Sequence, residues 1–146
     1  MKKYRVFDGH CDTAIELWRQ EQCLRRNSLA VSLERAEQLD GYAQFFAFCT
    51  AWLKTRMPHT ERFARALDYF LEQLRENADR ITLCRTMREA DAAMAAGKAA
   101  AFLAIEGAEA VREDAGLLEE AYEKGVRMVS LVWNLPNSLS GSCQTG

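Results

Sequence analysis

The alternation of buried strands with amphipathic helices constrains the fold of this chain more than any other feature of its sequence. Runs of apolar residues predict strands at residues 4–7, 42–49, 99–105 and 126–132, together with a short extended segment at 81–84. Helical spacing of apolar residues predicts helices at residues 13–24, 32–39, from 60 onward, 86–96 and 114–124. This strand-then-helix order, repeated about four times, predicts a parallel sheet with right-handed crossovers.

The expected helix starts depend on capping residues. Thr13 and Thr86 each open a T-x-x-E pattern, the capping box, and Thr60 is expected to cap the long helix that follows Pro58. In the last predicted helix, the side chains expected to face the core are Leu117, Leu118, Ala121 and Tyr122.

Two architectures satisfy this order, namely the doubly wound open sheet and the eight-stranded β/α barrel. The sequence contains neither G-x-G-x-x-G nor G-x-x-x-x-G-K-[ST], so the nucleotide-binding form of the open sheet gains no support. After residue 132 the chain runs into a loop, residues 133–141, without a closing element. The choice between the two architectures stays open at this point.

Composition narrows the classes of function. The chain has 146 residues, the size of one domain, and its net charge of −2 comes from basic residues scattered among acidic ones. Nucleic acid and anionic membranes are therefore not expected as partners, and we see neither a signal peptide nor a membrane span. Five widely spaced cysteines without a C-x-x-C pair indicate reduced thiols and a cytoplasmic protein.

Residues suited to metal binding follow the predicted strands. Reactive groups of a parallel β/α sheet lie at the carboxyl ends of the strands, where this chain places His10 and Asp12, then Glu106, then Trp133 and Asn134. His10 and Asp12 are two residues apart, so an extended backbone points both to the same side. One imidazole and two carboxylates are a donor set for zinc with an open fourth position.

Structural roles explain the same residues and remain open. Asp12 or Thr13 can cap the first helix, His10 can be a hydrogen-bonded loop residue, and Trp133 can be a core residue. A nucleophilic Cys11 beside His10 is disfavoured because adjacent residues of an extended segment point to opposite sides. The other histidine, His59, is expected at the surface.

Four segments, in order, resemble the membrane dipeptidases of peptidase family M19, within the wider group of metal-dependent amidohydrolase-like barrels. Residues 8–12, DGHCD, resemble the family's D-G-H-x-D, and residues 105–109, IEGAE, resemble its [IV]-E-G-[GA]-x. Residues 125–137 resemble its G-x-R-x-x-x-L-T-[HW]-N-x-x-N, and Gly41, Gln44, Phe45 and Phe46 match its G-x-x-x-Q-F-[FW].

The resemblance implies a (β/α)8 TIM barrel that hydrolyses dipeptides with two zinc ions. By resemblance His10 and Asp12 bind the first zinc, and Glu106, the catalytic carboxylate, bridges both. The two ions then turn a shared water into the attacking hydroxide. Gly9 is expected to let the backbone turn at the barrel rim, with Cys11 as a filler, and Trp133 and Asn134 contact the dipeptide substrate.

The chain also departs from the family. The family requires two further histidines from later strands, and its barrel is more than twice this long. We therefore expect residues 1–146 to be the N-terminal part of a single barrel domain, with about four β/α units, at most one zinc and no activity alone. The uncovered sheet predicts a homo-oligomer or pairing with the missing C-terminal half. A non-catalytic truncated relative, and an amidohydrolase with another amide substrate, remain alternatives.

Overall fold

A parallel five-stranded sheet forms the centre of the molecule. The computed structural model describes residues 4–112 and 114–144. The strands are β1 (Arg5–Cys11), β2 (Gly41–Cys49), β3 (Ile81–Leu83), β4 (Ala99–Glu106) and β5 (Val126–Ser130). The helices are α1 (Thr13–Gln20), α2 (Leu33–Ala36), α3 (His59–Glu76), α4 (Met87–Ala95), α5 (Glu109–Arg112) and α6 (Ala115–Glu123). The predicted α/β class and parallel sheet are confirmed.

The strand order distinguishes the two architectures that the sequence left open. β1, β2, β4 and β5 lie side by side in chain order, and β3 pairs with the first residues of β4, next to β5. Doubly wound sheets place their first strand in the interior of the sheet, whereas β1 pairs only with β2 among the described residues. Neighbouring strands that follow one another in sequence are the arrangement of a β/α barrel. The extended segment predicted at residues 81–84 is the strand β3, and the expected four strand-then-helix units precede β5.

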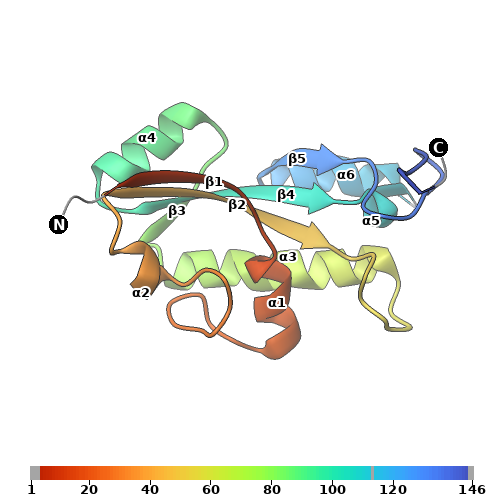
Figure 1. Cartoon of the computed structure of the whole chain (residues 1–146), viewed down its shortest axis with the longest axis horizontal. Helices are drawn as coiled ribbons and strands as arrows, with labels where there is room; N and C mark the ends of the chain where they lie inside the picture. The colour runs from red at the N-terminus through yellow and green to blue at the C-terminus, as the bar shows by residue number, and fades with distance from the viewer. Residues whose placement is uncertain (1–3, 113, 145–146) are drawn as a thin grey trace.

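Helices cover the two faces of the sheet unequally. Phe46 and Phe48 of β2 face α3, where their rings pack against Phe63 and Phe70. Ala43 of the same strand points the other way, toward α4. Figure 1 shows α1, α2 and α3 on one side of the sheet and α4 on the other. α4 lies beside the strand starts (Figure 1), and among the described residues no other helix covers the rest of this face.

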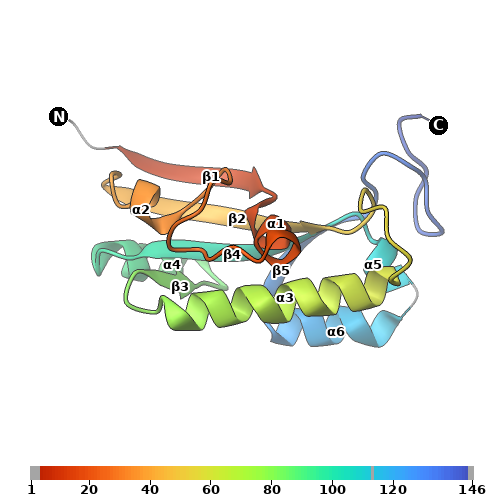
Figure 2. The ribbon, with the colours of Figure 1, turned by 90° about the horizontal axis from the view of Figure 1, so that it is seen from below.

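α6 runs beside α3 on the helix-covered side (Figure 2). Lys124, at its C-terminal end, pairs with Asp68 of α3 at 2.9 Å. Ala121 is buried, but Leu118 and Tyr122 are 44 % and 59 % exposed. Their predicted inward orientation was wrong, because only one side of α6 has a neighbour among the described residues.

Of the three predicted capping residues, one is confirmed and two were wrong. Thr86 accepts a hydrogen bond from the Glu89 amide, as its capping box predicted. The α3 cap is Pro58 instead of Thr60, because the Arg62 amide already donates to the Pro58 carbonyl. At α1 the capping position is Asp12, and Thr13 lies inside the helix.

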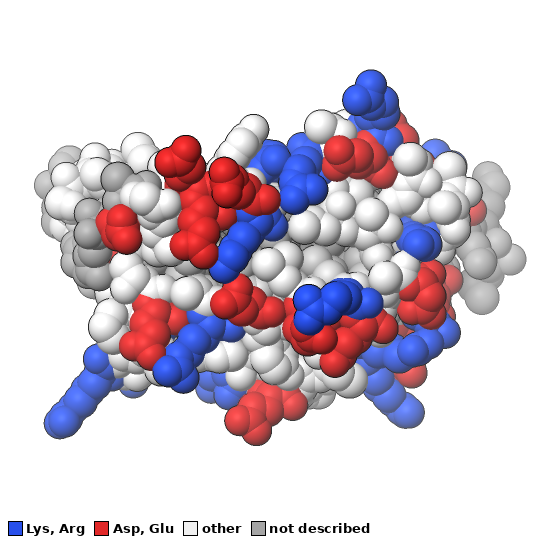
Figure 3. Space-filling model, turned by 180° about the vertical axis from the view of Figure 1, so that it is seen from behind, with Lys and Arg blue, Asp and Glu red and all other residues white. Residues whose placement is uncertain are grey.

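Charges of both signs share the surface. On the face shown in Figure 3, Lys and Arg side chains lie next to Asp and Glu side chains. Several contacts are ion pairs within a helix, such as Arg65 with Glu61 and Lys124 with Glu120. In the part of the chain that the structure describes, no helix is both long and apolar enough to cross a membrane.

Candidate metal centre

Three side chains from the carboxyl ends of β1 and β4 converge. The Nε2 atom of His10 lies 3.7 Å from Oδ1 of Asp12 and 3.6 Å from Oε2 of Glu106. One ligand atom from each of these residues lies within 4.8 Å of the other two. The structure therefore brings together the three residues that the sequence singled out, from segments almost 100 residues apart.

Backbone geometry at the end of β1 orients the first two residues. β1 continues to Cys11, four residues beyond the predicted end, with an irregular register between Asp8 and Cys11. The expected turn at Gly9 is thus a distortion inside the strand, and Gly9 does not have a positive φ. The His10 amide donates to Oδ1 of Asp8 at 3.1 Å, which fixes the backbone just before the histidine side chain.

Asp12 keeps its carboxylate available. It occupies the capping position of α1, but its side chain makes no capping hydrogen bond. Only its backbone carbonyl takes part in the helix, by accepting from the Glu16 amide at 3.1 Å. The alternative interpretation, in which the Asp12 side chain caps the helix, is therefore wrong. Its carboxylate is half-exposed and points toward His10.

Cys11 lies in the core, away from the cluster. Its side chain is 7 % exposed and belongs to the hydrophobic core. Burial raises the pKa of the thiol to about 11, so the thiolate is scarce at neutral pH. This agrees with the expected filler role and disfavours a nucleophilic role.

Glu106 is the least exposed of the three ligand candidates. Burial, and secondarily the charge of Asp12, raise the pKa of its carboxyl, while His10 and a hydrogen bond from Cys49 act in the opposite direction. Cys49 stands beside Glu106 in the β2–β4 register, and burial raises the pKa of its thiol to about 12. Sequence analysis assigned Cys49 no role at the site, although its position at the end of a predicted strand is a signal that could have placed it there.

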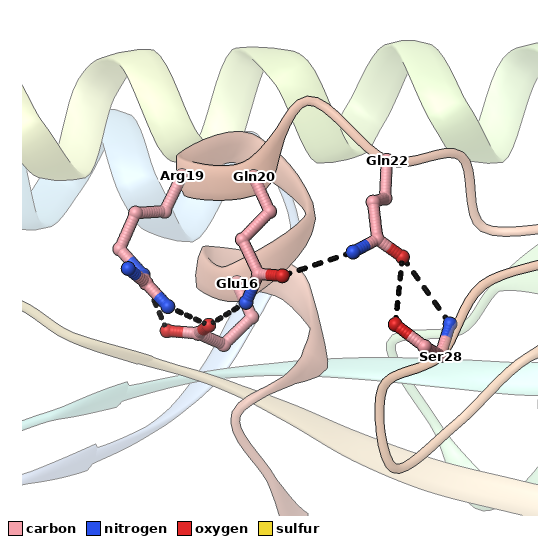
Figure 4. A network of polar contacts seen from close by, with 5 residues as sticks. All are labelled: Glu16, Arg19, Gln20, Gln22 and Ser28. Carbon is pink, nitrogen blue, oxygen red and sulfur yellow. Dashed lines mark hydrogen bonds and ion pairs between the residues drawn. The ribbon is translucent and has the colours of Figure 1, made fainter.

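Two of the three candidate ligands, His10 and Asp12, line a depression of about 400 Å³. Its lining includes Asp8, His10, Asp12 and Glu16. Figure 4 shows Glu16 held by Arg19 and Gln20 of α1, while Gln20 continues the network to Gln22 and Ser28. The Glu16 carboxylate is thus tied to its own helix and leaves the ligand set to His10, Asp12 and Glu106.

The donor set fits a divalent cation. Two carboxylates and one imidazole supply oxygen and nitrogen atoms of the kind that zinc binds, with a coordination position left open. A cation among them would also favour the ionised form of Glu106, which burial and Asp12 disfavour.

The other two predicted site residues follow β5. The strand ends at Ser130, two residues earlier than expected, and Trp133 and Asn134 lie in the loop beyond it. Trp133 is 38 % exposed, and its Cβ would be 3.4 Å from a Cβ added at Gly107, next to Glu106. Trp133 therefore lies beside Gly107, the residue that follows the candidate ligand Glu106, and is not the core residue of the alternative interpretation. Asn134 is exposed.

His59 is not the surface residue that was expected. It is half-buried at the start of α3, and its Nδ1 lies 3.0 Å from Oγ1 of Thr50. Thr50 comes directly after β2, so His59 lies near the same edge of the sheet but outside the ligand cluster.

Comparisons with known proteins match this chain to one family of peptidases. The family model of the membrane dipeptidases, peptidase family M19, matches residues 1–146. A structure of a family M19 dipeptidase is 25 % identical to this chain and has a TM-score of 0.74. The match covers 90 % of this chain and 44 % of the dipeptidase chain. A metallopeptidase of Rhodobacter sphaeroides, liganded with a phosphinate mimic of the dipeptide L-Ala-D-Ala, is 23 % identical with a TM-score of 0.76, covering 92 % and 47 %.

A curated relative gives a similar match. An uncharacterized protein in the PQQ-III 3' region of Acinetobacter calcoaceticus is 25 % identical over 90 % of this chain and 50 % of its own length. The chain thus spans about half the length of the relatives that it matches. Because the family model covers every residue, the chain belongs to the membrane dipeptidase family, peptidase family M19.

Proposed function

We propose that this chain supplies the first part of the metal site of a zinc-dependent dipeptidase, a hydrolase that cleaves the amide bond of dipeptides. The observation that carries the proposal is the convergence of His10, Asp12 and Glu106 at one edge of a parallel sheet. Family membership supports the reaction class. The dipeptide mimic bound by the R. sphaeroides metallopeptidase supports dipeptides as substrates.

Each site residue has a role in this proposal. His10 and Asp12 would hold a zinc ion, and Glu106 would contribute its carboxylate to the same metal site. Bound zinc supplies a water of lowered pKa for attack on the amide carbonyl. Trp133 and Asn134, in the loop after β5, line the dipeptide pocket beside Glu106.

We also propose that residues 1–146 form the N-terminal part of one barrel domain. Chain-ordered parallel strands and the match to about half of each relative support this division. The described residues contribute three ligands in one cluster, enough for one zinc with an open position. The second zinc requires ligands from outside this cluster, so the chain alone has no dipeptidase activity.

Zinc titration of the metal-free chain tests the proposal. Isothermal titration calorimetry is expected to show one zinc per chain, with much weaker binding after His10→Ala. His59→Ala is the matched control, because it removes the other histidine and leaves the cluster intact. Equal zinc affinity in His10→Ala and the unaltered chain would overturn the metal site. Hydrolysis of L-Ala-D-Ala by the unaltered chain that a chelator inhibits and that His10→Ala abolishes would contradict the proposal that the chain alone is inactive.

A non-catalytic role through self-association is the second candidate. It is favoured by Phe7, which is 53 % exposed on the sheet face that α1 and α3 leave uncovered. A second copy, or the C-terminal half of a barrel, would bury this face.

All five cysteines are free in the structure, which supports a reducing compartment such as the cytoplasm.

A further inference from the structure

A buried carboxylate lies one turn beyond the candidate ligand Glu106. Glu109, the first residue of α5, is 8 % exposed. Its Oε1 accepts a hydrogen bond from Nδ2 of Asn137 at 3.3 Å, whereas Oε2 has no hydrogen-bond partner among the described residues. Burying a carboxylate with so few partners costs free energy. Stability alone therefore does not explain this residue.

Asn137 organises the loop that follows β5. Its Nδ2 also donates to the Leu131 carbonyl at 2.7 Å. Its Oδ1 accepts from the amides of Leu139 and Ser140 at 2.9 and 3.2 Å, and its own amide donates to the Ser140 carbonyl at 3.0 Å. A single side chain thus closes the turn and joins it to the end of β5.

Further hydrogen bonds join this loop to the residues after Glu106. The Gly107 amide donates to Oγ of Ser130 at 3.0 Å, and the Ala108 amide donates to the Leu131 carbonyl at 3.2 Å. Oε2 of Glu109 lies so close to Gly107 that an added Cβ would come within 2.3 Å of it. The carboxylate therefore packs directly on the turn that carries Glu106.

We propose that Glu109 and Asn137 are positioning residues, a clamp that holds the β5 loop, with Trp133, against the turn after Glu106. The clamp orients the Glu106 carboxylate and places Trp133 at the mouth of the metal cluster. The inference rests on the proposed function to the extent that Glu106 is a metal ligand. The loop contacts themselves do not depend on it.

Trp133 reports the loop position directly. The chain has three tryptophans, so Trp18→Phe with Trp52→Phe leaves Trp133 as the only one. In this background Asn137→Ala and Glu109→Ala are expected to raise acrylamide quenching of Trp133 about 2-fold, because a released loop exposes the ring. Glu109→Gln keeps an acceptor oxygen at the same size and is expected to preserve the quenching. Ser138→Ala, exposed in the same loop, is the control.

Metal affinity reports the effect on Glu106. Removing a side chain that hydrogen-bonds to a metal ligand lowers metal affinity by about 10–100-fold. Glu109 and Asn137 act on Glu106 less directly, so Asn137→Ala and Glu109→Ala are expected to lower zinc affinity roughly 3–10-fold. The double variant is expected to be no worse than Asn137→Ala alone, because Asn137→Ala already removes the contact with Glu109. Glu109→Gln is expected to restore the affinity, a rescue that a general loss of stability would not show.

The outcomes separate this inference from the proposed function. Unchanged Trp133 quenching in folded Asn137→Ala and Glu109→Ala, checked by circular dichroism, would overturn the clamp. Increased quenching with unchanged zinc affinity would overturn its role in orienting Glu106. If the unaltered chain binds no zinc, the proposed function fails, while the quenching series still decides whether the clamp exists.

Discussion

At the scale of single residues, Glu106 has opposite effects on stability and on metal binding. Burial raises the pKa of its carboxyl, so the folded chain binds a proton there more tightly than the unfolded chain. Between the ordinary and the raised pKa the folded state carries more protons, and the free energy of unfolding falls as the pH rises through that window. Metal binding requires the ionised form, so zinc affinity falls as the pH drops through the same window.

Glu106→Gln is therefore expected to abolish zinc binding while leaving the metal-free chain at least as stable at pH 7. Urea unfolding between pH 4 and 7 in the presence of a chelator measures this, and the decline in stability that Glu106 contributes should disappear in the variant. Glu119→Gln, an exposed carboxyl on α6, is the control. A variant clearly less stable than the unaltered chain at pH 7 would show that the buried charge does not destabilise the fold.

Gly107 is required by its conformation and by its neighbour. Its φ is +78°, and a Cβ there would meet Oε2 of Glu109 at 2.3 Å. Gly107→Ala is expected to lower the free energy of unfolding by about 1–3 kcal/mol from backbone strain, with the close contact adding to this. Gly9→Ala is the control, since nothing lies within 4 Å of a Cβ at Gly9. Urea denaturation of both variants checks the difference, and equal losses would contradict it.

At the scale of elements, one side chain of α3 holds the connection that precedes it. Arg62 is 5 % exposed and donates to the backbone carbonyls of four residues. These are Thr50, Leu53, Thr55 and Met57, at 2.7, 2.9, 3.3 and 2.7 Å. The loop that follows β2 is therefore shaped by a guanidinium that belongs to the next helix.

Arg62→Met is expected to release this loop. It leaves buried carbonyls without their donor, which costs about 1–3 kcal/mol for each unsatisfied group. Limited proteolysis should then cut within residues 50–57 much faster than in the unaltered chain. Arg65→Met, on an exposed face of the same helix, should leave the cleavage rate unchanged. Protection of the loop in Arg62→Met would show that other contacts hold it.

At the scale of the whole molecule, one sheet face is only partly covered. Phe7, Phe45 and Phe102 form an aromatic cluster with ring centroids 5.0–6.1 Å apart. Phe7 is 53 % exposed, and Met128 of β5 is 40 % exposed. In the described part of the chain, β1 pairs only with β2 and β5 only with β4, and an apolar patch beside such open strand edges favours association.

We expect the 146-residue chain to associate in solution, measured by size-exclusion chromatography with light scattering. Phe7→Asp places a charge in the aromatic cluster and is expected to shift the population toward monomer. Leu139→Asp changes an equally exposed apolar residue in the loop after β5 and should have little effect. An unaltered chain that is monomeric and unfolds in one sharp transition would contradict this expectation.

Much of the architecture was predictable because strand periodicity and helix spacing are local. The parallel sheet, the cap at Thr86 and the positions of His10, Asp12 and Glu106 at strand ends all followed from short segments. The predictions were wrong where the outcome depends on contacts with other parts of the chain. Thr60 lost its capping role to Pro58, and α6 exposes Leu118 and Tyr122, because burial depends on what packs beside an element.

The sequence by itself determined which side chains reach the carboxyl edge of the sheet. Alternation along the first strand orients His10, and Glu106 is the last residue of its strand. Only the tertiary structure decided that β4 lies between β2 and β5 and that the two carboxylates meet one imidazole within 4.8 Å. It alone showed that Glu109 packs on Gly107 and reaches Asn137. Contacts between distant segments depend on strand order and register, and local propensities do not encode either.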